Sequence, residues 1–103
     1  MGLRKGSSRE TGLLDVAMHI VALQAMANAR IVITLTAGDH NGRADVAVGA
    51  VAYDRTVDGP DQPVLGSVSV NCLATQLWMM DAALIHTLYL LDGEIARRVM
   101  SRE

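Results

Sequence analysis

Four polar side chains have the types and spacing needed to bind a ligand or move a proton. Asp15 and His19 are four residues apart in a stretch with helical periodicity, so the carboxylate lies one turn from the imidazole and can orient it. Asp81 and His86 are titratable groups of a second helical stretch. If the chain binds a small molecule, we expect Asp15, His19, Asp81 and His86 to supply its polar contacts. The competing interpretation of the Asp15–His19 pair is simple helix stabilisation.

A second carboxylate pair lies within the second helical stretch. Asp81 and Asp92 are eleven residues apart, close to three turns, and both fall between two apolar stripes. Three turns separate them by about 16 Å, which is too far to share a proton. We therefore expect each to need water or a partner: Arg30, Arg55 or Arg98 of the same or a neighbouring subunit, or a ligand cation. A structural ion pair or a dimer-specificity contact is the favoured interpretation, and a functional site is the alternative.

The remaining reactive side chains match no catalytic motif. Asp39, His40, Arg43 and Asp45 cluster at a predicted turn, where adjacent side chains point to opposite faces and no second His or Cys stands at ligand spacing. Cys72 has no His nearby in sequence and is expected to be a buried, inert thiol. The sequence contains no P-loop, dinucleotide fingerprint, zinc spacing or nucleophile elbow, so it predicts no cofactor and no metal, and leaves enzymatic activity undecided.

Length and composition predict one small domain. The chain has 103 residues, half of them hydrophobic, with three aromatic residues and no Phe. We expect residues 1–10 to form a flexible basic tail and residues 11–103 a single α+β domain. The net charge of −2 disfavours nucleic acid and anionic membranes. Charges interrupt every apolar stretch, no secretory signal is recognised and there is one cysteine, so we expect no membrane span and a cytoplasmic protein.

The strongest structural signal is a β-hairpin over Arg30–Tyr53 that turns at Asn41-Gly42. Asn-Gly suits a type I′ turn, which needs positive φ at both central residues. With this turn the pairs on one face are all apolar, and those on the other are small or polar. The apolar pairs are Ile31 with Ala52, Ile33 with Ala50, Leu35 with Val48, and Ala37 with Val46. A slip of one residue would mix the two sets, so the register is predicted together with the hairpin.

The residues before the hairpin predict a helix from about Gly12 to Ala29, beginning near the capping box Ser7-x-x-Glu10 or at Thr11. One apolar stripe of this helix contains Leu13, Val16, Ile20, Leu23 and Ala27. A second contains Leu14, Met18, Val21, Ala25 and Ala29. A surface helix of a monomer needs one stripe, so two stripes predict burial on two sides.

A third strand is predicted over Val64–Cys72, after an acidic, turn-rich connection that we expect to be exposed. Pro63 opens this strand, which favours a position at the edge of the sheet. Strict alternation points one set of side chains to each face. Val64, Val68, Val70 and Cys72 form one set, and Leu65, Ser67, Ser69 and Asn71 form the other.

A second helix is predicted from Leu73 to about Met100, capped by Asn71, with Asp92-Gly93 as a point where it ends, kinks or continues. Its main apolar stripe contains Leu73, Leu77, Met80, Leu84, Leu88, Leu91, Ile95 and Val99. A second stripe contains Trp78, Ala82, Ile85, Tyr89 and Ala96. The polar arc holds Thr75, Gln76, His86, Thr87, Glu94 and Arg97.

Together these elements predict a two-layer α+β fold of order α-β-β-β-α, a three-stranded antiparallel meander with two helices packed on one face. The order resembles that of double-stranded RNA-binding domains over most of the chain. Those domains carry a basic cluster at the start of the second helix, where this sequence reads LATQLW over residues 73–78. The resemblance therefore implies a topology without the RNA contacts.

The surplus of apolar helix surface predicts a homodimer or higher oligomer. Candidate interface residues are Trp78, Ala82, Ile85, Tyr89 and Asp92. The function we expect is that of a protein-interaction module: an adaptor, scaffold or inhibitor. The alternative is a small-molecule-binding protein or small enzyme with its pocket between helices and sheet or at the dimer interface. Nucleic-acid binding through Arg4, Lys5, Arg9 and the hairpin tip is a third, weaker hypothesis.

Overall fold

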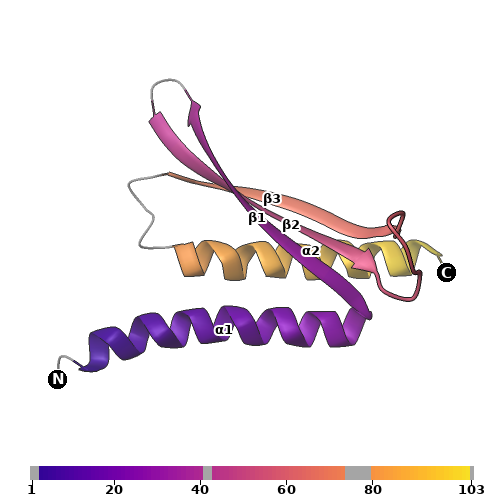
Figure 1. Ribbon diagram of the computed structural model, residues 1–103, viewed down its shortest axis with the longest axis horizontal. Coiled ribbons are helices and arrows are strands. Elements are labelled where there is room, and N and C mark those ends of the chain that lie inside the picture. Colours follow the sequence, from indigo (N-terminus) through magenta and orange to yellow (C-terminus); the bar gives the residue numbers. More distant parts are fainter. Residues whose placement is uncertain (1–2, 41–42, 74–79, 103) are drawn as a thin grey trace.

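The computed structural model describes the backbone of residues 3–40, 43–73 and 80–102, and side chains over 12–39, 44–73 and 80–100. Its elements are α1 (Leu3–Ala27), β1 (Ala29–His40), β2 (Arg43–Asp54), β3 (Val64–Leu73) and α2 (Met80–Arg102). The three strands form one antiparallel sheet in the order β1-β2-β3. The predicted α-β-β-β-α order and meander are therefore confirmed (Figure 1).

The predicted hairpin register is confirmed at every pair. Ile31 lies opposite Ala52, Ile33 opposite Ala50, Leu35 opposite Val48 and Ala37 opposite Val46. The pairing continues to His40 and Arg43, which flank the turn. The turn residues Asn41 and Gly42 lie outside the described part of the chain. Alternation with a period of two explains this success, because a shifted register would expose every apolar side chain of the inner face.

The predicted facing of β3 is wrong at its start. Ala52 pairs with Gly66 while Tyr53 pairs with Val64, so Leu65 is an extra residue on β3. This β-bulge reverses the alternation. Leu65 packs against the core and Val64 is exposed, the opposite of the prediction.

Both helices contribute to one hydrophobic core on the face of the sheet that carries Ala50 and Ala52. α1 packs beside β1 and α2, whereas α2 lies against β3 and β2. Burial of these small residues and of the aliphatic side chains above them supplies the main driving force for folding, at about 25 cal/mol per Å² of apolar surface. The buried members are Val16, Leu23, Ala29, Ala50, Ala52, Leu88, Leu91 and Ile95.

α1 differs from its predicted limits at both ends. It begins at Leu3, so the proposed caps Ser7 and Thr11 lie inside the helix. No proline interrupts this segment, so the helix continues through it although half of residues 3–12 are glycine, serine or threonine. The helix ends at Ala27 because Asn28 adopts a left-handed conformation, with φ 49°. Ala29, predicted as helical, is the buried first residue of β1.

The predicted start of the second helix is also wrong. Asn71 and Leu73 are strand residues, because β3 continues along β2 as far as the pair Asp45–Leu73. Residues 74–79 lie outside the described part of the chain, and α2 is described from Met80. The helix continues through Gly93, which resolves the alternatives left open there.

The predicted position of Thr87 on the polar arc of α2 is wrong. This residue is fully buried. Its hydroxyl donates a 2.7 Å hydrogen bond to the Ala83 carbonyl oxygen one turn earlier. A threonine whose hydroxyl is satisfied within its own helix presents a methyl group to its neighbours, and so it tolerates burial.

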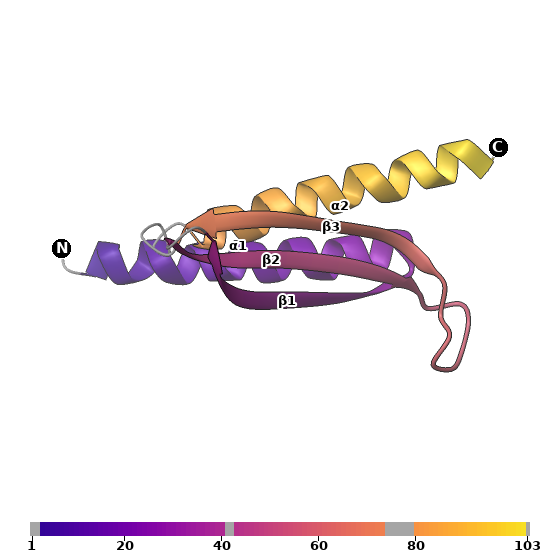
Figure 2. The ribbon, with the colours of Figure 1, turned by 90° about the horizontal axis from the view of Figure 1, so that it is seen from above.

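The helices run in the same direction (Figure 1) and separate toward their C-terminal ends (Figure 2). They approach closely at Gly12 of α1 and Asp81 of α2. The tip of the β1–β2 hairpin extends away from both helices (Figure 1). Two features of this arrangement define the functional site: an open cleft between the diverging helices, and helix and strand surfaces that nothing in the described chain covers.

Candidate functional site

The four side chains predicted to bind a ligand do not converge. His19 donates a 2.8 Å hydrogen bond from Nδ1 to the backbone carbonyl oxygen of Asp15, so the imidazole is held by the main chain and not by the carboxylate. Asp81 lies against Gly12 and accepts a 3.1 Å hydrogen bond from the Ala82 amide. His86 is exposed. Of the four, His19 alone lines either of the two cavities described here.

His19 meets Tyr89 across the two helices. The ring centroids are 6.0 Å apart with an interplanar angle of 57°. The two rings border a small cavity of about 120 Å³, which Leu23, Met26 and Leu88 also line. One predicted ligand residue and one predicted interface residue are thus brought together by the packing of α1 on α2.

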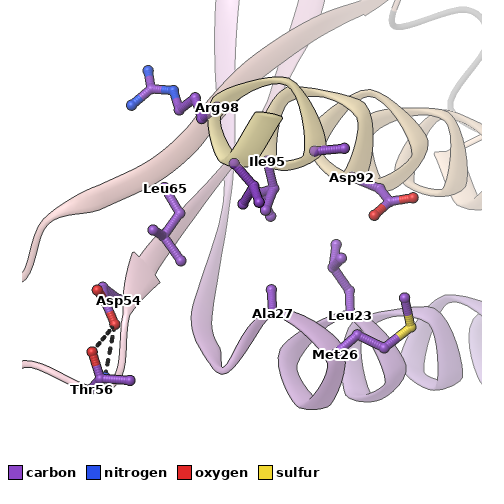
Figure 3. A pocket seen from close by; sticks show the side chains of 11 residues that line it. Leu23, Met26, Ala27, Asp54, Thr56, Leu65, Asp92, Ile95 and Arg98 are labelled. Atoms are coloured by element: carbon purple, nitrogen blue, oxygen red, sulfur yellow. Dashed lines mark hydrogen bonds between the residues drawn. The ribbon is translucent and has the colours of Figure 1, made fainter. Parts of the chain in front are cut away.

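A larger cleft of about 380 Å³ opens where the helices diverge. Leu23 and Ala27 of α1 form one wall, and Ile95 of α2 forms the opposite wall (Figure 3). Leu65 closes the side toward the sheet, a position it reaches through the β-bulge. The cleft is therefore predominantly apolar and joins the smaller cavity along Leu23, Met26 and Asp92, which line both.

The polar groups of the cleft lie at its rim. Asp54 accepts hydrogen bonds from the amide and the hydroxyl of Thr56, at 2.9 and 2.5 Å. Arg98 points away from the cleft (Figure 3) and donates a 3.0 Å hydrogen bond to the Val64 carbonyl oxygen. Asp92 is exposed between the two cavities. Neither it nor Asp81 makes an ion pair with a described residue, so the predicted arginine partners are not found in that part of the chain.

The ion pairs that the structure shows surround Glu94. Its carboxylate lies 2.6 Å from Nη2 of Arg97 and 3.4 Å from Nε of Arg98. The hydrogen bond from Arg97 is the main reason that the pKa of Glu94 lies below its ordinary value, and Arg98 adds to the effect. The cluster holds Arg98 close to the edge of β3.

The predicted interface residues of α2 have different environments. Tyr89 is 65% exposed, and Ala82 and Asp92 are also exposed. Ile85 instead packs against the protein's own core. Trp78 lies outside the described residues. The second stripe of α2 is therefore divided between the core and the surface.

Among the residues whose side chains are described, α1 has an uncovered apolar surface. Leu14, Met18 and Val21 are 59%, 60% and 64% exposed, and Ala25 beside them is exposed as well. These four residues, the outer face of α1, point away from the core residues Val16 and Leu23. The predicted second stripe of this helix contained all four, but no interface role was assigned to them. The sequence feature that could have identified this stripe as an interface is that it contains no charged residue.

No group of three or more His, Cys, Asp or Glu residues within the described chain is arranged to hold a metal ion. None of the described helices combines the length and the apolar character required to cross a membrane. No family model, curated protein or solved structure matches this chain. The function must therefore be inferred from the surfaces themselves.

Proposed function

We propose that this protein is a homo-oligomeric interaction module, an adaptor, scaffold or inhibitor that acts by presenting a surface. The observation that carries the proposal is the outer face of α1, where Leu14, Met18 and Val21 are each more than half exposed. Contiguous apolar patches of this kind mark protein contacts, because water is excluded from them when a partner binds. A cytoplasmic location belongs to the same proposal, since the single cysteine needs no oxidising compartment.

The test is the molar mass in solution, measured by light scattering over a range of concentrations. We expect a multiple of the 11.0 kDa chain mass. Met18→Asp and Val21→Asp should each weaken association roughly tenfold or more, because burying such a side chain contributes about 1.5–3 kcal/mol and 1.4 kcal/mol is a factor of ten. Met100→Asp changes an equally apolar, exposed side chain on α2 and serves as the matched control. Equal effects of all three substitutions would contradict the proposal.

The cleft supports a second candidate, the binding of a small apolar molecule. Its volume of about 380 Å³ lies in the range of ligand pockets, about 300–1,000 Å³. The carboxylate of Asp92 at its rim favours a ligand that carries a positive charge. Ala96→Trp, which fills the cleft, should abolish binding of an apolar amine dye, whereas Ala82→Trp on an exposed part of α2 should leave it unchanged. Saturable binding that survives Ala96→Trp would exclude the cleft.

A further inference from the structure

Beyond Ile31, the outer edge of β1 is a row of backbone groups without a hydrogen-bond partner among the described residues. The Ile31 amide donates a 3.2 Å hydrogen bond to Oε1 of Gln24 on α1, so this amide points away from β2. Backbone direction alternates along a strand, and the amides of Ile33, Leu35 and Ala37 therefore point outward as well. Within the described residues, Ile31 is the one outward amide of this edge that has a hydrogen-bond partner.

The two edge strands of the sheet differ in the features that prevent pairing with another strand. The edge of β3 begins after Pro63, has the bulge at Leu65, and has Arg98 donating to the Val64 carbonyl oxygen. Proline, bulges and charged side chains are the devices that prevent an edge from pairing with another strand. From Ala29 to His40 the edge strand β1 has no proline and its pairing with β2 has no irregularity. These devices lie at the start of β3, whereas β1 carries none of them along its length.

The side chains of the same segment are also uncovered. Leu35 and Ala37 belong to the apolar face of the hairpin, yet Leu35 is 57% exposed and Ala37 is exposed. The ends of β1 and β2 that flank the turn extend away from both described helices (Figure 1), and neither Leu35 nor Ala37 belongs to the core cluster of the described residues. Outward backbone amides and exposed apolar side chains therefore occur together on this segment of β1.

We propose that β1 pairs along this edge with β1 of a second copy of the chain, antiparallel and about a twofold axis at Leu35. Two three-stranded sheets would then form one sheet of six strands. The inference rests on the self-association proposed above but names a different surface, the strand edge in place of the outer face of α1. The paired strands satisfy the outward amides and carbonyls and cover the exposed leucine in one step.

The chemistry of the segment selects a copy of itself as the partner, because the strand is self-complementary about Leu35. In that register Leu35 lies opposite its symmetry mate, and Ile33 lies opposite Ala37. Over residues 33–37 every apolar side chain of the inner face then lies opposite an apolar one, and Thr34 lies opposite Thr36 on the other face of the sheet. The pairing ends there, because Ile31, which would lie opposite Asp39, already has its amide bonded to Gln24. A centre one residue further along would place Ile33 opposite Asp39. A centre one residue earlier would leave the Ala37 amide opposite Ile31, whose amide is already bonded to Gln24.

The first experiment is disulfide trapping in a Cys72→Ala background, which removes the buried native thiol. Leu35→Cys would place two thiols on directly opposed residues, whose Cα atoms in a hydrogen-bonded pair are about 5.5 Å apart, within disulfide range. We expect mild oxidation to convert this variant to a covalent dimer at least tenfold faster than Ser69→Cys, which is exposed on β3. Equal rates for the two variants would overturn the proposal.

The second experiment uses proline, which removes an amide donor. The Ala37 amide points away from β2, so Ala37→Pro blocks the edge without removing a bond of the β1–β2 ladder. We expect light scattering to give a lower molar mass for Ala37→Pro than for wild type and the control Ala37→Val at the same concentration, and the single-chain mass of 11.0 kDa for Ala37→Pro combined with Met18→Asp, which removes both proposed contacts. If Ala37→Pro does not fold, as judged by circular dichroism, the trapping experiment decides alone.

These measurements distinguish failure of the β1 strand pairing from failure of the contact through the outer face of α1. A dimer that Met18→Asp dissociates and Ala37→Pro does not would overturn the strand pairing and retain the outer face of α1 as the contact. A dimer that Ala37→Pro dissociates and Met18→Asp does not would support the strand pairing and contradict the role given to α1. A wild-type chain that stays at 11.0 kDa at every concentration would overturn both.

Discussion

The carboxylate of Asp81 occupies the space in which a Cβ atom on Gly12 would stand. A glycine at this position lets the N-terminal part of α2 approach α1, and the same carboxylate accepts a hydrogen bond from the Ala82 amide. The helices diverge from this contact toward the open cleft. The Gly12–Asp81 contact therefore sets the geometry of the cleft from its closed end.

Gly12→Ala is expected to stabilise the protein less than Gly93→Ala, although both replace a helical glycine. Alanine gains about 1 kcal/mol in helix propensity, but the new methyl group displaces the Asp81 carboxylate, which accepts the hydrogen bond from the Ala82 amide, and this offsets the gain. Gly93→Ala is the matched control, because a Cβ there meets nothing within 4 Å, and it should stabilise α2 by about 0.5–1 kcal/mol. Urea unfolding measures both changes.

The same experiment in an Asp81→Ala background tests the cause. With the carboxylate removed, Gly12→Ala should stabilise the protein as much as Gly93→Ala, since only the propensity gain remains. A difference between the two that persists without Asp81 would show that another contact excludes the methyl group.

Thr87 is expected to tolerate loss of its hydroxyl but not the introduction of a charge. Thr87→Val keeps the shape, and the Ala83 carbonyl keeps its backbone hydrogen bond, so the free energy of unfolding should change by less than about 1 kcal/mol. Thr87→Asp places an unpaired carboxylate in the core and should cost several kcal/mol. Chemical denaturation distinguishes the two, and a large loss in Thr87→Val would mean that the hydroxyl has a role beyond its own helix.

Asn28 is expected to be replaceable by glycine and not by alanine. Its φ of 49° lies in the left-handed region, where a Cβ costs about 1–2 kcal/mol and asparagine is tolerated better than most residues. Asn28→Ala should lower the free energy of unfolding by about 1 kcal/mol relative to Asn28→Gly. The backbone bond from the Arg55 amide to the Asn28 carbonyl oxygen is common to both variants, which makes the comparison matched. Equal stabilities would show that the turn relaxes when Asn28 is replaced.

The contribution of Glu94 should depend on pH in a defined direction. The hydrogen bond from Arg97 depresses its pKa in the folded state below the ordinary value of 4.5. A depressed carboxyl pKa contributes stability above 4.5, and this contribution is lost as the pH falls from 4.5 through the folded-state pKa. Glu94→Gln should therefore be less stable than wild type at pH 7 and equal to it in strong acid. Added salt should reduce the difference at pH 7, and a difference that grows in acid would contradict the assignment.

Some features could be predicted because they depend on patterns local to the chain. The hairpin register follows from alternation, since one slipped residue would move Leu35 and its neighbours to the wrong face. The two stripes of the first helix follow from its period, and Leu14, Met18 and Val21 are the stripe left in water. The order of the five elements follows from the same periodicities.

Other features depend on contacts between distant residues and could not be predicted. The bulge that turns Leu65 inward arises from the pairing of β3 with Ala52 and Tyr53. Leu13, predicted in the core stripe, is exposed and Thr87 is buried, because the positions of the sheet and the partner helix decide which flank of each helix is covered. The meeting of His19 with Tyr89 likewise needs both helices in place.

The sequence alone thus determined which side chains of the hairpin share a face and how its two strands pair, because those properties repeat with a period that a few neighbouring residues reveal. Tertiary structure alone decided which of those faces stay in water. The angle at which α1 and α2 diverge, and the length by which the hairpin extends past them, are set by the packing of the whole domain. These two quantities leave the cleft, the outer face of α1 and the edge of β1 open.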